Sequence, residues 1–392
     1  MRIAHIVPVA NHTPWFADIC AETARQGHDV IAIIHSAPGN LSERLTRLGI
    51  RHYRVPMHFA EDLDRARPLF YLLRLPLAAL RVARILRRER IDVAHSHIFV
   101  ANVVARLAKP FARAKHVAGA ASPRHLEAPF TRRLDRAMRP LDDAIAAGCQ
   151  YIADMYDHPR ARTIYYGPPA ERFDPSTTDA MSFRRDLGIA ADVPLVGLVA
   201  HFYPPMRGPQ APPATRGIGL KGHDHFLAAA RIVAKRFPDA RFVLVGGGSN
   251  ALGEEYRQSL IDSVRGEDRF LFPGHRYDIA EVLASFDVAV QCALTETLGG
   301  TVEALLMERP LVATRVGGMP EAVRHEETGL LVPPADPPAL AAAIERLLAD
   351  RDEARRLGKA GRALMLKRFT LARTGDDLTA LYRSLARVSC GA

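Results

Sequence analysis

Short apolar runs alternate with amphipathic stretches along most of the chain. In the first half, the apolar runs occupy residues 3–7, 29–34, 51–55, 92–95, 116–119, 144–147 and 163–166. Helical patterns separate these runs, and such strand and helix alternation predicts an α/β fold with a doubly wound parallel sheet. The second half repeats the pattern, with apolar runs at 193–200, 241–245, 269–272, 287–291 and 311–314.

Turn-forming residues concentrate between the two series of runs. Gly167 is followed by two prolines, and residues 174–179 read Asp-Pro-Ser-Thr-Thr-Asp. This density favours a domain boundary, and 392 residues exceed the usual size of a single core. We expect Rossmann-like domains over 1–170 and 171–368, which would face each other across a cleft, and a C-terminal helix over 369–392 that packs back toward the first domain.

The composition is that of a globular protein, with 48% hydrophobic and 24% charged residues. No apolar run reaches the roughly 18 to 20 residues of a transmembrane helix, and residues 1–8 resemble a strand rather than a signal peptide. The four cysteines are scattered without a C-x-x-C pair. This pattern predicts neither a disulfide framework nor a zinc site, and it favours a cytoplasmic location.

A net charge of +10 favours anionic partners such as nucleotide sugars, phospholipid headgroups or nucleic acid. Aromatic residues do not interleave with the basic ones, so we expect no nucleic acid partner. Arginines at 74, 81, 84 and 88 gather on one side of a helical pattern that we expect to begin near Pro76. This basic amphipathic helix fits either a solvated surface of a packed helix or a peripheral membrane contact.

Two carboxylates around a glycine turn form the most informative local pattern. Glu296 and Glu303 flank Gly299 and Gly300, with an apolar run on either side. We expect a loop with Glu296 and a helix that begins at the glycines and holds Glu303 one or two turns in. The N–H groups of Gly299, Gly300 and Thr301 would then face an anion or a sugar hydroxyl, and the glutamates would accept from ribose or hexose hydroxyls. The residues alone also fit an ordinary acidic helix N-terminus.

Three further features fall at predicted strand ends of the second half. Lys221-Gly222 precedes a helix starting near residue 224, where the lysine can neutralise a phosphate, with Arg207 or Arg216 as a forked partner. The glycine run 246–248, which contains Gly247, follows a predicted strand and could approach a phosphate. Gly274 and His275 lie in a segment that could pack against a nucleotide base. Each of the three is also compatible with a simple surface turn.

These segments resemble, in order, those of the retaining glycosyltransferases of the GT-B fold, glycosyltransferase family 4. The resemblance covers nearly the whole chain. Its segments are 92–97, 163–175, 219–222, 242–248, 272–274, 296–303, 310–314, 317–321 and 327–333.

The resemblance implies roles for individual residues. Lys221 is similar to the lysine that binds the donor diphosphate, Glu303 to the carboxylate on the ribose hydroxyls, and Glu296 to the one on the donor sugar. The implied donor-binding set is Lys221, Gly222, Arg216, Arg207, Gly247, Gly274, His275, Glu296, Thr297, Gly299, Gly300, Thr301 and Glu303. The implied catalytic set is His125, His97 and Glu296, because a histidine of the first domain often lies near the reacting carbon in this family. We rank His125 ahead of His97, and a structural role is the alternative for each.

Three departures from the family pattern affect the site. Six residues separate Glu296 from Glu303 where the family usually has seven, so Thr295 holds the strict position of the first glutamate. The usual Gly-Arg of the second domain is replaced by 201–205 and a long loop, which leaves the arginine partner of Lys221 open between Arg207 and Arg216. Residues 8–14 replace a glycine-rich turn that usually borders the acceptor, and this indicates an unusual acceptor.

We expect electrostatic stabilisation of the leaving diphosphate by Lys221, an arginine and a helix N-terminus, without a metal or other cofactor. Two Asp-x-Asp patterns, at 62–64 and 350–352, match metal-dependent transferases but lie in charged, surface-like segments.

The expected function is retaining transfer from a UDP- or GDP-sugar to a hydroxyl of a small molecule, a saccharide or an envelope glycan precursor. Two alternatives stay open: an epimerase or hydrolase of the same fold, and a non-catalytic protein that binds nucleotide sugars or docks on a membrane.

Overall fold

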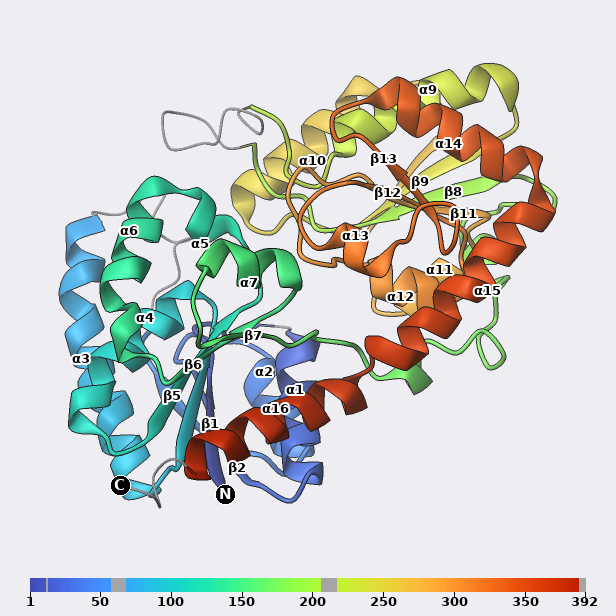
Figure 1. Cartoon of the computed structure of the whole chain (residues 1–392). Coiled ribbons are helices and arrows are strands. Elements are labelled where there is room, and N and C mark those ends of the chain that lie inside the picture. The colour runs from blue at the N-terminus through green and yellow to red at the C-terminus, as the bar shows by residue number, and fades with distance from the viewer. Residues whose placement is uncertain (12, 58–67, 206–216, 388–392) are drawn as a thin grey trace. The chain divides into compact units, whose positions relative to one another are not determined.

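The computed structural model describes residues 1–11, 13–57, 68–205 and 217–387. The chain forms two compact units (Figure 1). Unit 1 comprises Met1–Pro168 and Thr370–Ala392, and unit 2 comprises Pro169–Phe369. Both units are α/β, and every strand pairing in both sheets is parallel, so the predicted α/β class with two doubly wound parallel sheets is confirmed.

Unit 1 is built on a seven-stranded sheet in the order β3-β2-β1-β4-β5-β6-β7. Its strands are β1 (Arg2–Ile6), β2 (Asp29–His35), β3 (Arg51–Val55), β4 (Val93–His97), β5 (Lys115–Ala120), β6 (Ala144–Ala147) and β7 (Ala161–Thr163). Strand β7 ends at Thr163, earlier than the predicted run at 163–166. Thr163 pairs with Ala147, the last residue of β6, and one further bond follows, from the Ile164 N–H to the Ala147 oxygen.

Helices cover both faces of the unit 1 sheet because successive side chains of each strand point to opposite faces. Ile3 belongs to the core under α1 (Pro14–Arg25), α2 (Leu41–Arg47) and α16 (Leu371–Arg387). Its neighbour Ala4 belongs to the core under α3 (Pro68–Arg88) and α4 (Phe99–Ala108). The remaining elements are α5 (Arg124–Glu127), α6 (Pro129–Met138), α7 (Gln150–Tyr156) and the 3₁₀ turns η2 (Lys109–Phe111) and η3 (Arg139–Leu141).

Helix α3 begins at Pro68, so the expectation that it begins near Pro76 is wrong. Pro76 lies inside the helix. A proline there removes one backbone hydrogen bond, usually at a cost of about 3 kcal/mol. Pro76 is on the exposed side of α3, while Ala79 and Val82 are buried in the core. The apolar packing of the helix therefore continues on the opposite side from the missing bond.

Unit 2 contains a six-stranded sheet in the order β10-β9-β8-β11-β12-β13. Its strands are β8 (Leu195–Val199), β9 (Arg241–Val245), β10 (Phe270–Gly274), β11 (Val288–Gln291), β12 (Leu311–Thr314) and β13 (Leu330–Val332). The sequence pattern predicted the first five. Strand β13, which has only three residues and lies at the edge of the sheet, was not predicted.

The helices of unit 2 are η4 (Ala170–Arg172), α8 (Ser182–Asp186), α9 (His223–Arg236), α10 (Ala251–Ser263), α11 (Ile279–Ala284), α12 (Thr301–Leu306), α13 (Met319–Ala322), α14 (Pro337–Ala349) and α15 (Arg351–Arg368). A core that includes Phe226 of α9, Val290 of β11 and Ile344 of α14 packs against the sheet. In the described ranges, no helix is both long enough and apolar enough to cross a membrane.

Candidate functional site

Two of the charged residues predicted to bind the donor, Lys221 and Glu296, contact each other in unit 2. Glu296 lies in the loop between β11 and α12, and Lys221 lies just before α9. Lys221 Nζ donates a hydrogen bond to Glu296 Oε2 in an ion pair whose side chains are 20% and 12% exposed. The N–H of Thr297 donates to Glu296 Oε1 over 2.9 Å. A cation and an anion therefore lie within reach of a single ligand.

Two glycines allow the backbone to approach this ion pair closely. Gly222 caps α9 with φ at +73°, and a Cβ added there would lie 2.0 Å from the Cys292 oxygen. Gly317 has φ at +50°, and an added Cβ would lie 1.8 Å from the Glu296 oxygen. Only glycine fits either place without moving the backbone. Gly222 was predicted at the site; Gly317 was not in the predicted set, although it lies in one of the family-like segments.

The glycine turn before α12 is only partly available to a ligand. Gly300 caps the helix, and Gly299 has φ at +50°. Among the described residues, no hydrogen bond engages the N–H of Gly299 or Gly300. In contrast, Thr301 is buried, its N–H donates to the Leu298 oxygen over 3.2 Å, and its hydroxyl donates to Met319 Sδ. The structure thus leaves two of the three expected donors open.

Glu303 is the third residue of α12, so it lies in the first helical turn rather than one or two turns in. Its side chain is half-buried. Burial raises the pKa of Glu303 to about 7, and the positive charge of Arg172 opposes this rise. Within the described ranges, no hydrogen bond or ion pair reaches the carboxyl group. A sheltered carboxyl group without a partner is suited to bind hydroxyl groups.

Aromatic rings gather near Gly247 and Gly274. Gly274 ends β10 with φ at +79°, and an added Cβ on Gly247 would lie 3.6 Å from His275 Cβ. The His275 ring stacks on His201 with centroids 5.7 Å apart. His201 was not in the predicted set, because a histidine after a strand carries no signal by itself. Tyr203 was also outside that set, and its ring centroid lies 5.8 Å from Lys221 Nζ.

Arg207 and Arg216, the two predicted partners of Lys221, lie outside the described residues. The loop that holds Lys221 is tied to the Glu296 loop by the Leu294 N–H, which donates to the Leu220 oxygen over 2.8 Å.

His97, at the carboxyl end of β4 in unit 1, lies in a buried group of histidines with His5 and His95. The His95 and His97 ring centroids are 4.1 Å apart, and the His5 and His97 centroids are 5.3 Å apart. Burial, reinforced by the neighbouring histidines, lowers the pKa of His95 and His97 well below 6.5, so both rings are neutral near pH 7. Ile98, the next residue, has φ at +72° and ψ at 149°. Such a backbone is strained for a β-branched residue.

His125, in α5 of unit 1, is held by a separate set of contacts. Its Nε2 lies 2.9 Å from the Tyr156 hydroxyl, and its ring stacks on Phe99 with centroids 5.2 Å apart. Burial lowers the pKa of His125 to about 4, although Asp135 favours its protonated form. Tyr156 is held in turn by Arg139, whose guanidinium group donates to the backbone carbonyl oxygen of Tyr156 over 2.8 Å.

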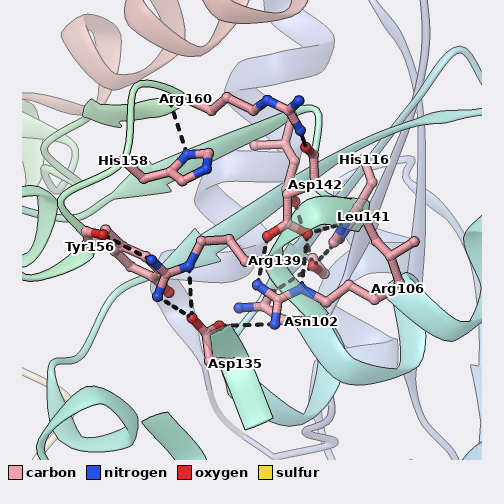
Figure 2. Close-up of polar contacts among 12 residues, drawn as sticks. Asn102, Arg106, His116, Asp135, Arg139, Leu141, Asp142, Tyr156, His158 and Arg160 are labelled. Carbon is pink, nitrogen blue, oxygen red and sulfur yellow. Dashed lines mark hydrogen bonds and ion pairs between the residues drawn. The ribbon is translucent and has the colours of Figure 1, made fainter. Parts of the chain in front are cut away.

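Figure 2 shows the buried polar network around Tyr156. Arg139 pairs with Asp135, and Asp135 pairs with Arg106. Arg106 also donates two hydrogen bonds to the Asp142 carboxylate, from Nε to Oδ1 over 2.9 Å and from Nη2 to Oδ2 over 2.6 Å. The four charged side chains of this network are thus paired, as buried charges must be. The network therefore holds Tyr156, the hydrogen-bond partner of His125, and the sequence did not reveal it because its members come from separate segments.

Comparison with known proteins agrees with this architecture. The model described as "Glycosyl transferases group 1" matches residues 216–350, and the one described as "Glycosyl transferase 4-like domain" matches residues 13–163. The D-inositol 3-phosphate glycosyltransferase of Geodermatophilus obscurus is 30% identical over 328 residues, which cover 75% of this chain and 67% of that protein. Its counterpart from Corynebacterium urealyticum is 29% identical over 320 residues, covering 75% of this chain and 72% of that protein.

Among solved structures, Anabaena HepE in complex with UDP-glucose is similar with a TM-score of 0.76 at 21% identity, and the match covers 100% of both chains. The fold is thus that of a GT-B glycosyltransferase. The chain belongs to the group 1 glycosyltransferases, glycosyltransferase family 4.

The raised pKa of Glu303 predicts a pH-dependent stability. Between its ordinary value of 4.5 and about 7, the folded carboxyl group keeps a proton that the unfolded chain releases. Stability therefore falls as pH rises through this window, by at most about 1.4 kcal/mol per pH unit. We expect Glu303→Gln, which cannot titrate, to gain stability relative to the unsubstituted protein from pH 5 to 7, with no further gain above pH 8.

Urea unfolding at each pH measures this difference. Glu255→Gln, at an exposed position of α10, is the matched control and should show no such trend. A Glu303→Gln difference that stays constant from pH 5 to 8 would contradict the raised pKa.

Proposed function

We propose that this chain transfers a sugar from a nucleotide-diphosphate donor to an acceptor hydroxyl, with retention of the anomeric configuration. The observation that carries the proposal is the contact of Lys221 with Glu296 in the unit that also holds Glu303, a sheltered carboxyl group without a partner among the described residues. A nucleotide sugar requires these groups: a cation for the diphosphate and acceptors for two sets of hydroxyls.

We assign Lys221 to the diphosphate, Glu303 to the ribose hydroxyls and Glu296 to the hydroxyls of the transferred sugar. The N–H groups of Gly299 and Gly300 add two donors beside Glu296. The stacked rings of His201 and His275 offer a surface for the base. UDP is our preferred nucleotide, since the HepE structure holds UDP-glucose.

The acceptor is proposed to be a hydroxyl-rich small molecule. The two relatives above are named for D-inositol 3-phosphate, a phosphorylated polyol, as substrate. The net charge of +10 suits a phosphorylated acceptor as well as the donor. Saccharides and lipid-linked glycan precursors are the other acceptors to test.

A donor and acceptor screen tests the function. Release of nucleoside diphosphate from UDP- and GDP-sugars is measured with and without inositol phosphates, saccharides or a lipid-linked acceptor. Release that depends on the acceptor, together with a product whose anomeric configuration matches the donor by NMR, is the expected result. Binding without release would favour a non-catalytic protein, and release that does not need an acceptor would favour a hydrolase.

The donor assignments predict a loss of nucleotide affinity in two variants. At pH 8, where the Glu303 carboxyl group is mostly ionised, Lys221→Ala and Glu303→Ala each remove a charge-assisted contact worth about 1.5 to 3 kcal/mol, roughly ten- to a hundredfold in Kd. Calorimetric titration of UDP and GDP into folded protein measures the loss. The exposed residues Lys235 and Glu255 provide matched alanine controls that should bind normally. Unchanged affinity in both site variants would refute the assignments.

We further propose that the reaction needs no metal ion. Lys221 supplies positive charge for the leaving diphosphate, which is the part that a divalent cation would otherwise play. Of the two Asp-x-Asp patterns, 62–64 lies outside the described residues. In the other, Asp350 caps α15 by accepting from the N–H of Glu353 over 2.8 Å, and Asp352 pairs with Arg355. These two aspartates are thus engaged in local helix contacts.

Metal independence predicts that transfer persists in excess EDTA, with less than a twofold loss of rate, because the charge on the leaving group is met by side chains. The assay compares initial rates before and after chelation. Abolition by EDTA with recovery in magnesium or manganese would contradict the proposal.

Peripheral membrane contact through α3 is a further part of the proposal. Two leucines on its outer side, Leu77 and Leu80, are 58% and 38% exposed. The side chains of Arg81, Arg84 and Arg88 are exposed beside them. Exposed apolar residues flanked by arginines are typical of helices that lie at a membrane interface.

A charge-neutralising variant tests this contact. Arg81→Gln with Arg84→Gln should weaken binding to vesicles containing phosphatidylserine by about 2 kcal/mol, roughly thirtyfold, at low salt. The control Lys359→Gln with Lys367→Gln removes the same charge from exposed positions of α15 and should bind normally. Equal, negligible co-sedimentation of the unsubstituted protein with neutral and anionic vesicles would refute the contact.

A further inference from the structure

Three polar groups form a hydrogen-bonded chain inside unit 1. His5 lies on β1 and His97 on the neighbouring β4, and Thr23 projects from α1. His5 Nδ1 lies 3.0 Å from His97 Nε2, and His5 Nε2 lies 3.1 Å from Thr23 Oγ1. All three side chains are at most 2% exposed. Water therefore does not compete for these contacts, and the positions of the protons are set by the three groups themselves.

The positions of the protons follow when each donor is matched to an acceptor. The Thr23 hydroxyl has one proton, which it donates to the Ile19 oxygen over 2.8 Å. Thr23 Oγ1 must then accept from His5, so His5 carries its proton on Nε2. A neutral imidazole has one donor and one acceptor nitrogen, so His5 Nδ1 accepts from the Nε2–H of His97. The remaining nitrogen, His97 Nδ1, is left as an acceptor.

The opposite polarity is also conceivable, but it makes one bond fewer. Thr23 would donate to His5 Nε2, His5 Nδ1–H would donate to His97 Nε2, and the bond to the Ile19 oxygen would be lost. His97 would then carry a proton on Nδ1, for which no acceptor occurs among the described residues. The first arrangement keeps the bond to the Ile19 oxygen and leaves only an acceptor, His97 Nδ1, without a partner among the described residues, so it is preferred.

The absence of a side chain at Gly119 keeps His97 Nδ1 uncovered on the β5 side. Gly119 pairs in register with His97, and a Cβ added there would lie 3.4 Å from this nitrogen and only 2.6 Å from the Ser96 backbone oxygen. Among the described residues, several side-chain nitrogens are fully buried and have no hydrogen-bond partner, such as both ring nitrogens of His223. His97 Nδ1 is not one of these fully buried atoms. This nitrogen therefore keeps some access to solvent. The strained backbone of Ile98 adjoins it, and such strain is concentrated at functional positions.

We propose that Thr23 and His5 are positioning residues that hold His97 in the Nε2–H tautomer, so that His97 Nδ1 accepts a hydrogen bond from a substrate hydroxyl. This role rests on the proposed sugar transfer, in which a substrate supplies the hydroxyl. The same ring in the other tautomer would present an N–H to that hydroxyl. The hydroxyl proton would then lose its acceptor.

Nitrogen NMR of protein labelled with ¹⁵N-histidine tests the tautomer without any substrate. Long-range proton–nitrogen spectra distinguish Nε2–H from Nδ1–H rings, and the variants His5→Gln and His97→Gln assign the two signals. We expect both rings of the unsubstituted protein to be neutral Nε2–H tautomers. An Nδ1–H tautomer at His97 would overturn the proposal. So would a change of both signals on addition of Zn²⁺, because the three ring nitrogens, which lie within 4.8 Å of one another, would then form a metal site.

Thr23→Val and Thr23→Ser separate positioning from packing. Valine keeps the shape but cannot accept from His5, so both rings should shift toward Nδ1–H and kcat should fall about tenfold, with KM changed less than twofold. Serine keeps the hydroxyl and should retain the tautomers and most of kcat. Unchanged ring signals in folded Thr23→Val would overturn the proposal. If the valine variant does not fold, the unsubstituted and serine spectra still decide the tautomer.

The tautomer and the transfer reaction can fail separately. A chain that transfers no sugar in the donor and acceptor screen would overturn the proposed function and the contact of His97 with substrate. Normal transfer by a protein with Nδ1–H at His97 would overturn only the inference drawn here.

Discussion

A parallel sheet that is covered on both faces leaves one place where polar side chains from several strands can meet, the line along which the strands end. Both sheets of this chain are of that kind. In unit 2 the constraint brings together loops that are distant in sequence: Lys221 comes before α9, Glu296 follows β11 and His275 follows β10. The ion pair between the first two residues is a direct product of this topology, since their segments are 75 residues apart.

The same constraint makes the histidines of unit 1 unusual. His5, His95 and His97 point into the space between the sheet and its helices, where apolar residues would be expected, and they are almost fully buried there. Burying them requires a hydrogen-bond partner for their ring N–H groups, and the partners come from α1 and α16 through Thr23 and Tyr382. The packing of α1 and α16 on the sheet is thereby linked to the orientation of the His97 ring at the end of β4.

Sequence patterns were sufficient for the α/β class, for all but one strand and for the segments that carry the family resemblance. They were sufficient because buried parallel strands and glycine-rich turns leave local signals. Other features depend on contacts that no local pattern records. The start of α3 was misplaced because Pro76 suggested a boundary, whereas packing on the opposite side of the helix tolerates it. The partners of His97 and His125 were missed because they lie on other elements of the fold.

Helix α16 completes the core of unit 1, although it follows unit 2 in the chain. Tyr382 lies 2.7 Å from His95 Nδ1, and Leu378 is buried against the same core. All of unit 2 is therefore synthesised before the last part of unit 1. Until α16 has been made, the apolar face that it covers lacks this helix, and His95 lacks its partner Tyr382. Unit 1, whose synthesis begins first, can thus complete its core only after the whole of unit 2 has been synthesised.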